Sequence, residues 1–110
     1  MANVFKNSIT GSIGTTNTIV YSVPSATTTT IIGVNVANVA TQNISVSVRL
    51  TDTSASKTVY LVKDALITAG SSLVLVGGEQ KIVMEATDTL AVVSSAATSA
   101  DVIVSALELS

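Results

Sequence analysis

PSATTTTIIGVNVANV, residues 24 to 39, can be either a low-complexity spacer or the entry to a buried β-strand. Pro24 cannot donate a ladder hydrogen bond, so it belongs before a strand or at its start. The threonines at 27–30 are β-branched and favour extended backbone, whereas a flexible linker uses Gly and Ser. An apolar run follows them without interruption. The stretch therefore predicts a strand in which Gly33 marks a bulge or the close approach of another backbone.

Alternating apolar and polar residues recur along the rest of the chain, and the helical period of 3.6 is nowhere sustained. Turn signals such as Gly77-Gly78 separate short apolar runs at a spacing of about 8–12 residues, which is typical of a sandwich or small barrel. No run reads as a crossover helix, which disfavours a parallel α/β sheet. We predict an all-β fold, an antiparallel β-sandwich or jelly-roll-like barrel of about eight short strands, near 17–23, 28–38, 43–51, 57–63, 65–68 with 72–76, 80–86, 89–94 and 101–109.

The first sixteen residues differ from the rest, because their apolar residues are scattered and two glycines, Gly11 and Gly14, interrupt them. We divide the chain into an N-terminal arm, residues 1–16, and a single β-sandwich domain, residues 17–110. An arm that docks on a neighbouring subunit and a strand along the edge of its own domain are both open. The candidate subunit-interface residues of this segment are Val4, Phe5, Lys6, Ile9 and Ile13.

Charge is scarce, at 11% of the residues against about 25% in ordinary soluble domains. Residues 7–48 carry no charge at all. A free monomer usually keeps itself soluble with mixed surface charge. Either neighbouring subunits cover much of this surface, or Ser and Thr side chains alone keep it soluble.

The residues that usually carry out catalysis or bind metal are few. There is no histidine and no cysteine, which removes the commonest general base and the thiolate zinc ligand. The carboxylates are dispersed and mostly lie beside turns, and Asp52 and Asp88 are expected to cap turns through hydrogen bonds to backbone. We predict no catalytic residue, no cofactor and no metal site, and we expect the protein not to be an enzyme.

Composition also bears on partners. A net charge of −2 gives no basic footprint, so we expect no nucleic-acid binding. The N-terminal residues lack the continuous apolar segment of a secretory signal, and no apolar run approaches the roughly 18 residues of a membrane helix, so we expect no membrane association. With two tyrosines and one phenylalanine, the chain offers little material for the aromatic platforms of a glycan-binding module.

Three segments in order carry a resemblance to a known group of proteins: FKNSITGSIGTT (5–16), TIVYSVPSATTTTIIGVNVAN (18–38) and the run from VRLTDTSASKTVYLVK to the closing LELS (48–110). Together they resemble small virion structural proteins of tailed bacteriophages, including cyanophages. The resemblance implies a β-sandwich present in many copies in the virion, assembled in the host cytoplasm, and it implies no catalytic residues.

The expected function is therefore that of a phage virion structural protein, a capsid cement or decoration protein that stabilises the particle through multi-copy contacts. A neck or tail accessory protein and a receptor- or glycan-binding module on the virion remain as alternatives. The expected partners are further copies of the chain in a homo-oligomer and other virion proteins, either the major capsid protein or neck and tail proteins.

Overall fold

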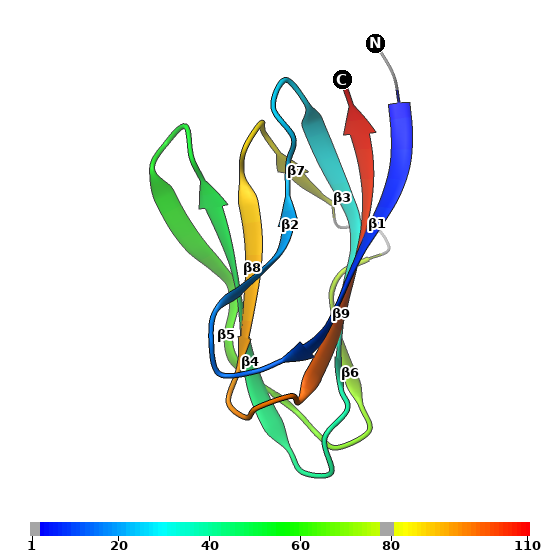
Figure 1. The fold of residues 1–110 in the computed structure, drawn as a ribbon, viewed down its shortest axis with the longest axis vertical. Helices are drawn as coiled ribbons and strands as arrows, with labels where there is room; N and C mark the ends of the chain where they lie inside the picture. Colours follow the sequence, from blue (N-terminus) through cyan, green and yellow to red (C-terminus); the bar gives the residue numbers. More distant parts are fainter. Residues whose placement is uncertain (1–2, 78–80) are drawn as a thin grey trace.

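The computed structural model describes residues 3–77 and 81–110, and within them the chain forms two packed antiparallel sheets (Figure 1). The described part contains no helix, so none is long and apolar enough to cross a membrane. The all-β sandwich prediction is confirmed. The strands are β1 (Asn3–Ile13), β2 (Thr18–Ser22), β3 (Thr28–Asn38), β4 (Ile44–Asp52), β5 (Lys57–Ile67), β6 (Ser72–Val76), β7 (Ile82–Met84), β8 (Thr89–Ser94) and β9 (Ala100–Leu109).

The order of the strands is that of a jelly roll. The first sheet runs β1-β9-β3-β6, with the short β7 also paired to β3, and the second sheet runs β2-β8-β4-β5. Most connections carry the chain from one sheet to the other, and strands from both ends of the sequence lie side by side, as β1 and β9 do (Figure 1). This is the double-sheet arrangement in which two Greek keys close around one core.

Strand β3 settles the nature of the threonine-rich stretch. It begins at Thr28, after Pro24, and runs through the centre of the first sheet between β9 and the pair β6 and β7. Thr29 and Ile31 are fully buried, so the threonines lead into the core as predicted. The register to β9 shifts between Ile31 and Gly33, which confirms the expected bulge.

The core between the sheets is almost entirely aliphatic. β-Branched side chains dominate it because both sheets offer pleated surfaces on which they pack well. Tyr21 is the one aromatic side chain among the described buried residues. The largest fully buried side chains are Ile13, Ile31, Ile44, Met84, Leu90, Val34, Val36, Val46, Val48, Val76, Val92 and Val102.

Residues 3–13 form the edge strand β1 of the first sheet, so of the two possibilities for this segment the structure has the strand along its own domain. Its register to β9 runs from Asn3 opposite Leu109 to Ile13 opposite Ala100. The two glycines do not divide this segment into shorter strands. Gly14 lies beyond β1, and Gly11 lies near its end, at the register shift. The described residues therefore contain nine strands where about eight were expected.

The boundaries of other strands differ in two places. The predicted strand at 57–63 and the run at 65–68 are one long strand, β5, which continues through Asp64 with a left-handed φ of 53°. Of the predicted strand at 80–86, residue 80 lies outside the described residues, and residues 81–86 contain the strand Ile82–Met84. The expected turn at Gly77-Gly78 also lies partly outside them.

Candidate functional site

The outer face of the first sheet carries exposed apolar side chains from four strands. Successive side chains of a strand point to opposite faces, so the buried positions of β1 and β9 identify those that point outward. We call this set the apolar face: Phe5, Ile9, Val74, Val83 and Ile103, with exposed fractions of 75%, 71%, 64%, 65% and 40%.

The register of the strands arranges these side chains in two rows. In the first row Ile9 lies opposite Ile103, which lies opposite Asn35 on β3, which in turn lies opposite Val74 on β6. In the second row Phe5 on β1 lies opposite Leu107 on β9, which lies opposite Thr30 on β3. Thr30 in turn lies opposite Val83 on β7. The rows form a continuous surface across the sheet, because directly paired side chains stand about 4.5–5.5 Å apart.

The surface between the two rows of the apolar face is recessed. A shallow depression of about 280 Å³ is lined by Phe5, Lys6, Asn7, Ile32, Ser105 and Ala106. It forms where the β3 bulge displaces Ile32 and where β9 contributes the small Ser105. Nearby, the buried Oδ1 of Asn35 accepts no hydrogen bond from the described residues. A partner that covers this face would find a recess there.

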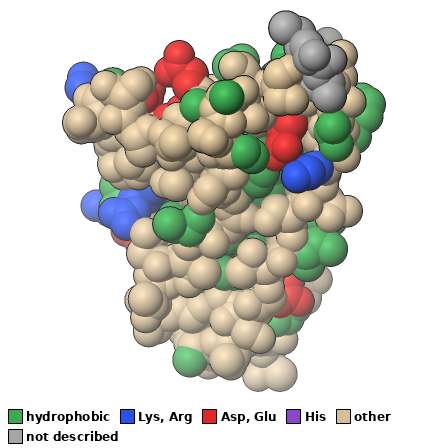
Figure 2. Space-filling model, turned by 45° about the horizontal axis from the view of Figure 1, so that its top comes forward, with side chains coloured by type: hydrophobic (Ala, Val, Ile, Leu, Met, Phe, Trp, Pro, Cys, Tyr) green, Lys and Arg blue, Asp and Glu red, His purple; other side chains and the backbone are tan. Residues whose placement is uncertain are grey.

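Charge is nearly absent from this surface. Among the described strand residues that point outward on the first sheet, Asp101 carries a charge, and it lies at the start of β9, where its Oδ1 accepts a hydrogen bond from the backbone N–H of Ser12 at 3.0 Å. Figure 2 shows one view of the molecule on which acidic and basic side chains occupy a few separate places and uncharged surface fills the rest. Uncharged surface of this extent favours contact with another protein surface over contact with a charged ligand.

The five candidate interface residues divide into three environments. Phe5 and Ile9 belong to the apolar face. Val4 and Lys6 alternate with them and point to the other side of β1, where Lys6 approaches Glu108. Ile13 is buried in the domain's own core, so it is not available to a neighbouring subunit. A contact role for the exposed members remains a prediction.

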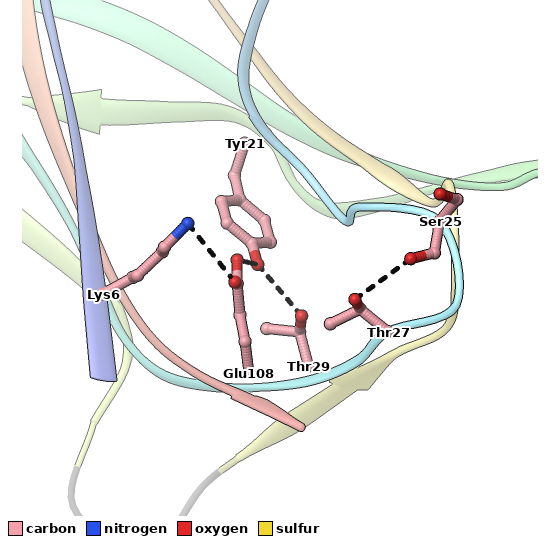
Figure 3. A network of polar contacts seen from close by, with 6 residues as sticks. All are labelled: Lys6, Tyr21, Ser25, Thr27, Thr29 and Glu108. Atoms are coloured by element: carbon pink, nitrogen blue, oxygen red, sulfur yellow. Dashed lines mark hydrogen bonds and ion pairs between the residues drawn. The ribbon is translucent and has the colours of Figure 1, made fainter. Parts of the chain in front are cut away.

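A buried polar network lies behind β1 and joins the two sheets (Figure 3). Tyr21 on β2 donates a hydrogen bond of 2.6 Å to Oε2 of Glu108 on β9. The hydroxyl of Thr29 on β3 lies 2.9 Å from the Tyr21 oxygen. The Nζ of Lys6 lies 3.5 Å from Oε1 of Glu108. Tyr21 thus crosses the core to give a buried carboxylate the partner that its burial requires.

The environment of Tyr21 raises its pKa to about 12 from the ordinary value of 10.0. Burial is the main cause, because the phenolate would lose its hydration in the core. The hydrogen bond to Glu108 adds to the effect, since it needs the phenol proton, while Thr29 acts in the opposite direction. The group therefore holds its proton at neutral pH and serves as a structural donor.

Three carboxylates that are dispersed in the sequence meet in space, which corrects the expectation that they stay apart. Oxygens of Asp52, Glu85 and Asp88 lie within 4.8 Å of one another. Asp88 is buried, and its carboxylate oxygens accept hydrogen bonds from the backbone N–H groups of Thr53, at 3.2 Å, and of Glu85, at 2.9 Å. These bonds hold the turns before β5 and β8, as predicted for Asp88.

Asp52 has the capping role that the sequence predicts for it. Its Oδ1 accepts hydrogen bonds from the hydroxyl of Ser54 at 2.8 Å and the N–H of Ala55 at 3.1 Å. These two donors lower the pKa of the Asp52 carboxyl below its usual value. The cluster is therefore explained by turn formation, and we assign it no ligand.

The two tyrosines do not form an aromatic platform. Tyr21 is in the core, and Tyr60 is half-exposed on β5 with Arg49 and Lys63 near its ring, at 6.0 Å and 5.5 Å from the ring centroid. These cation–π contacts use the ring within the chain itself.

The sequence did not predict several residues of the apolar face. Val74, Val83 and Ile103 were assigned to strands without being recognised as exposed. The run DVIVSALEL held a usable signal, because it is apolar at alternate positions on both faces, with Val102 and Val104 inward and Ile103 outward. The buried Glu108 had no signal, since its partner Tyr21 is 87 residues away.

The topology places the chain in the jelly-roll class, an architecture that occurs in viral capsid and lectin domains. No protein-family profile and no curated protein sequence matches it. Among the solved structures that share the fold is a chain of the disulfide-linked pili of Bacillus endospore appendages, with a TM-score of 0.56, 13% identity and coverage of 98% of this chain and 88% of that one.

A second structure with this fold is a chain of the T13 IBDV viral particle, with a TM-score of 0.57 and 11% identity. The match covers 96% of this chain and 30% of that one, so our chain spans less than a third of the viral protein's length. At these identities the likeness concerns the fold.

Proposed function

We propose that this chain is a non-enzymatic structural protein of a bacteriophage virion, a capsid cement or decoration protein that stabilises the particle through contacts made by many copies. The observation that carries the proposal is the apolar face. It extends over four strands, carries almost no charge and is held in place by paired strands, and a surface of this kind normally marks a protein interface.

Two further observations support the proposal. The jelly-roll fold is shared with a chain of a viral particle, and the sequence resembles phage virion proteins over nearly its whole length. The pilus neighbour suggests a different assembly, but those pili are disulfide-linked, and the present chain has no cysteine with which to form such a link.

The test is to purify phage particles that carry this chain and to measure its copy number by quantitative mass spectrometry and its position by particle reconstruction. A cement protein is expected in many symmetric copies on the capsid, with its apolar face against capsid subunits or other copies. A small number of copies at one vertex would instead indicate the neck or tail alternative. Absence from the particle would overturn the proposal.

A functional measurement complements the location. Particles that lack the chain are expected to release their genome at a lower temperature than complete particles, measured by the fluorescence of a DNA-binding dye during heating. Adding the purified protein back should restore the higher temperature. Equal temperatures with and without the protein would contradict a cement role.

Receptor or glycan binding is the weaker alternative, because the half-exposed Tyr60 is already in contact with two cationic side chains of the same chain. A glycan array with the wild-type protein and the Tyr60→Ala variant tests it directly. Dose-dependent binding that the substitution abolishes would favour this alternative over a cement function.

A further inference from the structure

The four sheet edges of this molecule differ in how well they are protected against pairing with another strand. Edge strands are normally protected by short length, by charged residues, by proline or by bulges. At the edge formed by β6 and β7 the strands have five and three residues, and β2 has five residues and is followed closely by Pro24. These three strands are too short to offer a long unpaired ladder.

Strand β5 is long, but it carries other protection. It has eleven residues with Lys57, Lys63 and Asp64 among them. The left-handed φ of Asp64 and two register shifts to β4 bend the strand away from a straight ladder. A second strand could not follow this edge without meeting both the bend and the charges.

Strand β1 lacks these features over most of its length. It also has eleven residues, with no proline and with Lys6 as its single charge. Lys6 is engaged with Glu108 on the inner side of the strand. The register shift and the left-handed Ser12 come only at the end. From Asn3 to Thr10 the backbone pairs with β9 on one side and offers its other side as a regular template.

We propose that a second copy of this chain pairs with β1 through its own β1, antiparallel and across a twofold axis at Asn7, so that the first sheets of the two copies become one. The proposal rests on the proposed function in that it names the contact by which copies associate. An isologous contact of this kind uses the same strand on both sides and closes as a dimer.

The sequence of β1 selects this register. With Asn7 opposite Asn7, Phe5 lies opposite Ile9 of the second copy on the outer face, and Lys6 lies opposite Ser8 on the inner face. Pairs of an aromatic and a β-branched side chain are favourable in this position. Both apolar residues on the outer face of each strand thus gain an apolar partner, and the apolar faces of the two copies join.

The neighbouring registers are worse. The outward side chains of the two copies stay on the same face only if the twofold axis passes through a residue. Moving the axis to the next residue shifts every pairing by two residues. An axis at Lys6 would place the two lysines directly opposite each other, and like charges there are destabilising. An axis at Ser8 would place Phe5 opposite Gly11 and Ile9 opposite Asn7, so both apolar pairs would be lost.

The contact is small for an independent dimer. Seven paired residues, from Val4 to Thr10, span about 24 Å at roughly 3.4 Å per residue. A single added strand covers less than the ~800 Å² per partner of a standard interface. Pairing should therefore depend on concentration in solution, and it becomes effective when many copies are held together on one particle, where the local concentration is high.

Disulfide trapping tests the axis, since the natural chain contains no cysteine. In the Asn7→Cys variant the two Cα atoms would lie about 4.5–5.5 Å apart across the pair, within the range that a disulfide spans. The control is Ile9→Cys on the same face, where the two cysteines would be about 14 Å apart. Oxidation should give a covalent dimer on non-reducing gels for Asn7→Cys at a yield several times that of the control.

A charge pair tests the register independently. The double variants F5K/I9K and F5K/I9E replace the same two exposed side chains, but the first places Lys opposite Lys and the second places Lys opposite Glu. Sedimentation velocity at low salt should show at least about tenfold weaker association for F5K/I9K than for F5K/I9E. Circular dichroism confirms that each variant is folded, which is expected because both positions are exposed.

Equal trapping of the two cysteine variants, or equal association of the two charge variants, would overturn the twofold β1 pairing. The first measurement remains decisive if a charge variant fails to fold. The proposed function is judged separately, by copy number in the particle. A chain that is present in many copies but shows neither effect would keep its cement role and lose this contact.

Discussion

At the scale of single residues, Tyr21 is the side chain on which most depends, because it links the second sheet to a buried carboxylate in the first. Removing its hydroxyl in Tyr21→Phe leaves Glu108 with the half-exposed Lys6 as its remaining partner. We expect the free energy of unfolding in urea to fall by about 1–3 kcal/mol, the cost of a buried polar group that loses its hydrogen bond.

The matched control is Tyr60→Phe, which removes the same atom from a half-exposed side chain. It should change the free energy of unfolding by less than about 0.5 kcal/mol. Equal effects of the two substitutions would show that the network around Glu108 contributes nothing specific to stability.

The raised pKa of Tyr21 gives a second prediction, for alkaline pH. The folded pKa of about 12 lies above the unfolded value of 10.0, so the folded state holds the proton more tightly. The associated stability is fully present below pH 10 and is lost as the pH rises from 10 to 12. A shift of this size corresponds to about 2–3 kcal/mol.

The measurement is urea unfolding of the wild type and of Tyr21→Phe at a series of pH values. All other side chains are the same in both proteins, so the difference between the two curves isolates Tyr21. That difference should shrink from pH 10 to pH 12. A constant difference across this interval would contradict the assignment. Absorbance titration of the Tyr60→Phe variant, in which Tyr21 is the single tyrosine, gives the pKa directly.

At the scale of the element, β3 shows how strongly one face of a strand is coupled to the core. Ile31 is fully buried, and its neighbour Ile32 is only partly buried at the bulge. Ile31→Ala should lower the free energy of unfolding by about 2–5 kcal/mol, through lost burial and the cavity left behind. Ile32→Ala should cost about 1 kcal/mol or less.

The two substitutions remove identical atoms from adjacent positions, so their difference measures burial alone. Thermal unfolding followed by circular dichroism is sufficient, because an effect of 1 kcal/mol shifts the midpoint by several degrees in a domain of this size. Comparable midpoints for both variants would mean that the bulge does not turn Ile32 out of the core.

Strand β3 also shows what sequence reasoning can predict. The strands at 28–38 and 89–94 were predicted at the bounds that the structure has, because the period-2 pattern, β-branched residues and flanking turn signals all agree there. Strand β1 was harder, since Phe5 and Ile9 point outward and the segment therefore lacks the pattern of a half-buried strand. Its pairing with β9 depends on residues almost a full chain length away.

The candidate site was predictable to the same degree. Phe5 and Ile9 could be predicted as interface residues, because apolar residues in a segment with no evident pattern of burial are expected to contact a partner. Their neighbours on the apolar face could not, since the sequence does not show that β9, β6 and β7 share a sheet with β1. The strand order decides which exposed residues become one surface, and it follows from contacts distant in sequence.

Deletion of residues 2–13 is consequently an unsuitable way to remove the proposed contact. It would take away β1, one of the two strands that pair with β9, together with the buried Ile13 and the Lys6–Glu108 ion pair. Loss of such an edge strand destabilises the domain whatever happens to assembly. Substitutions at the exposed Phe5 and Ile9 leave the core in place and address the contact itself.

At the scale of the whole molecule, the low charge content determines how assembly should respond to salt. Surfaces that associate through charged groups weaken as salt screens them. The apolar face and the proposed β1 pairing use apolar side chains and main-chain hydrogen bonds, and the nearest ion pair, between Lys6 and Glu108, is within one chain.

We therefore expect self-association of the wild-type chain to change by less than about threefold between 50 mM and 500 mM NaCl, measured by sedimentation velocity at several protein concentrations. The F5K/I9E variant is the internal control, since its association would depend on opposite charges and should weaken clearly over the same range. A wild-type protein whose association also weakens tenfold would indicate that its copies meet through the charged residues of β5 and the turns, and that the apolar face is covered by a different protein.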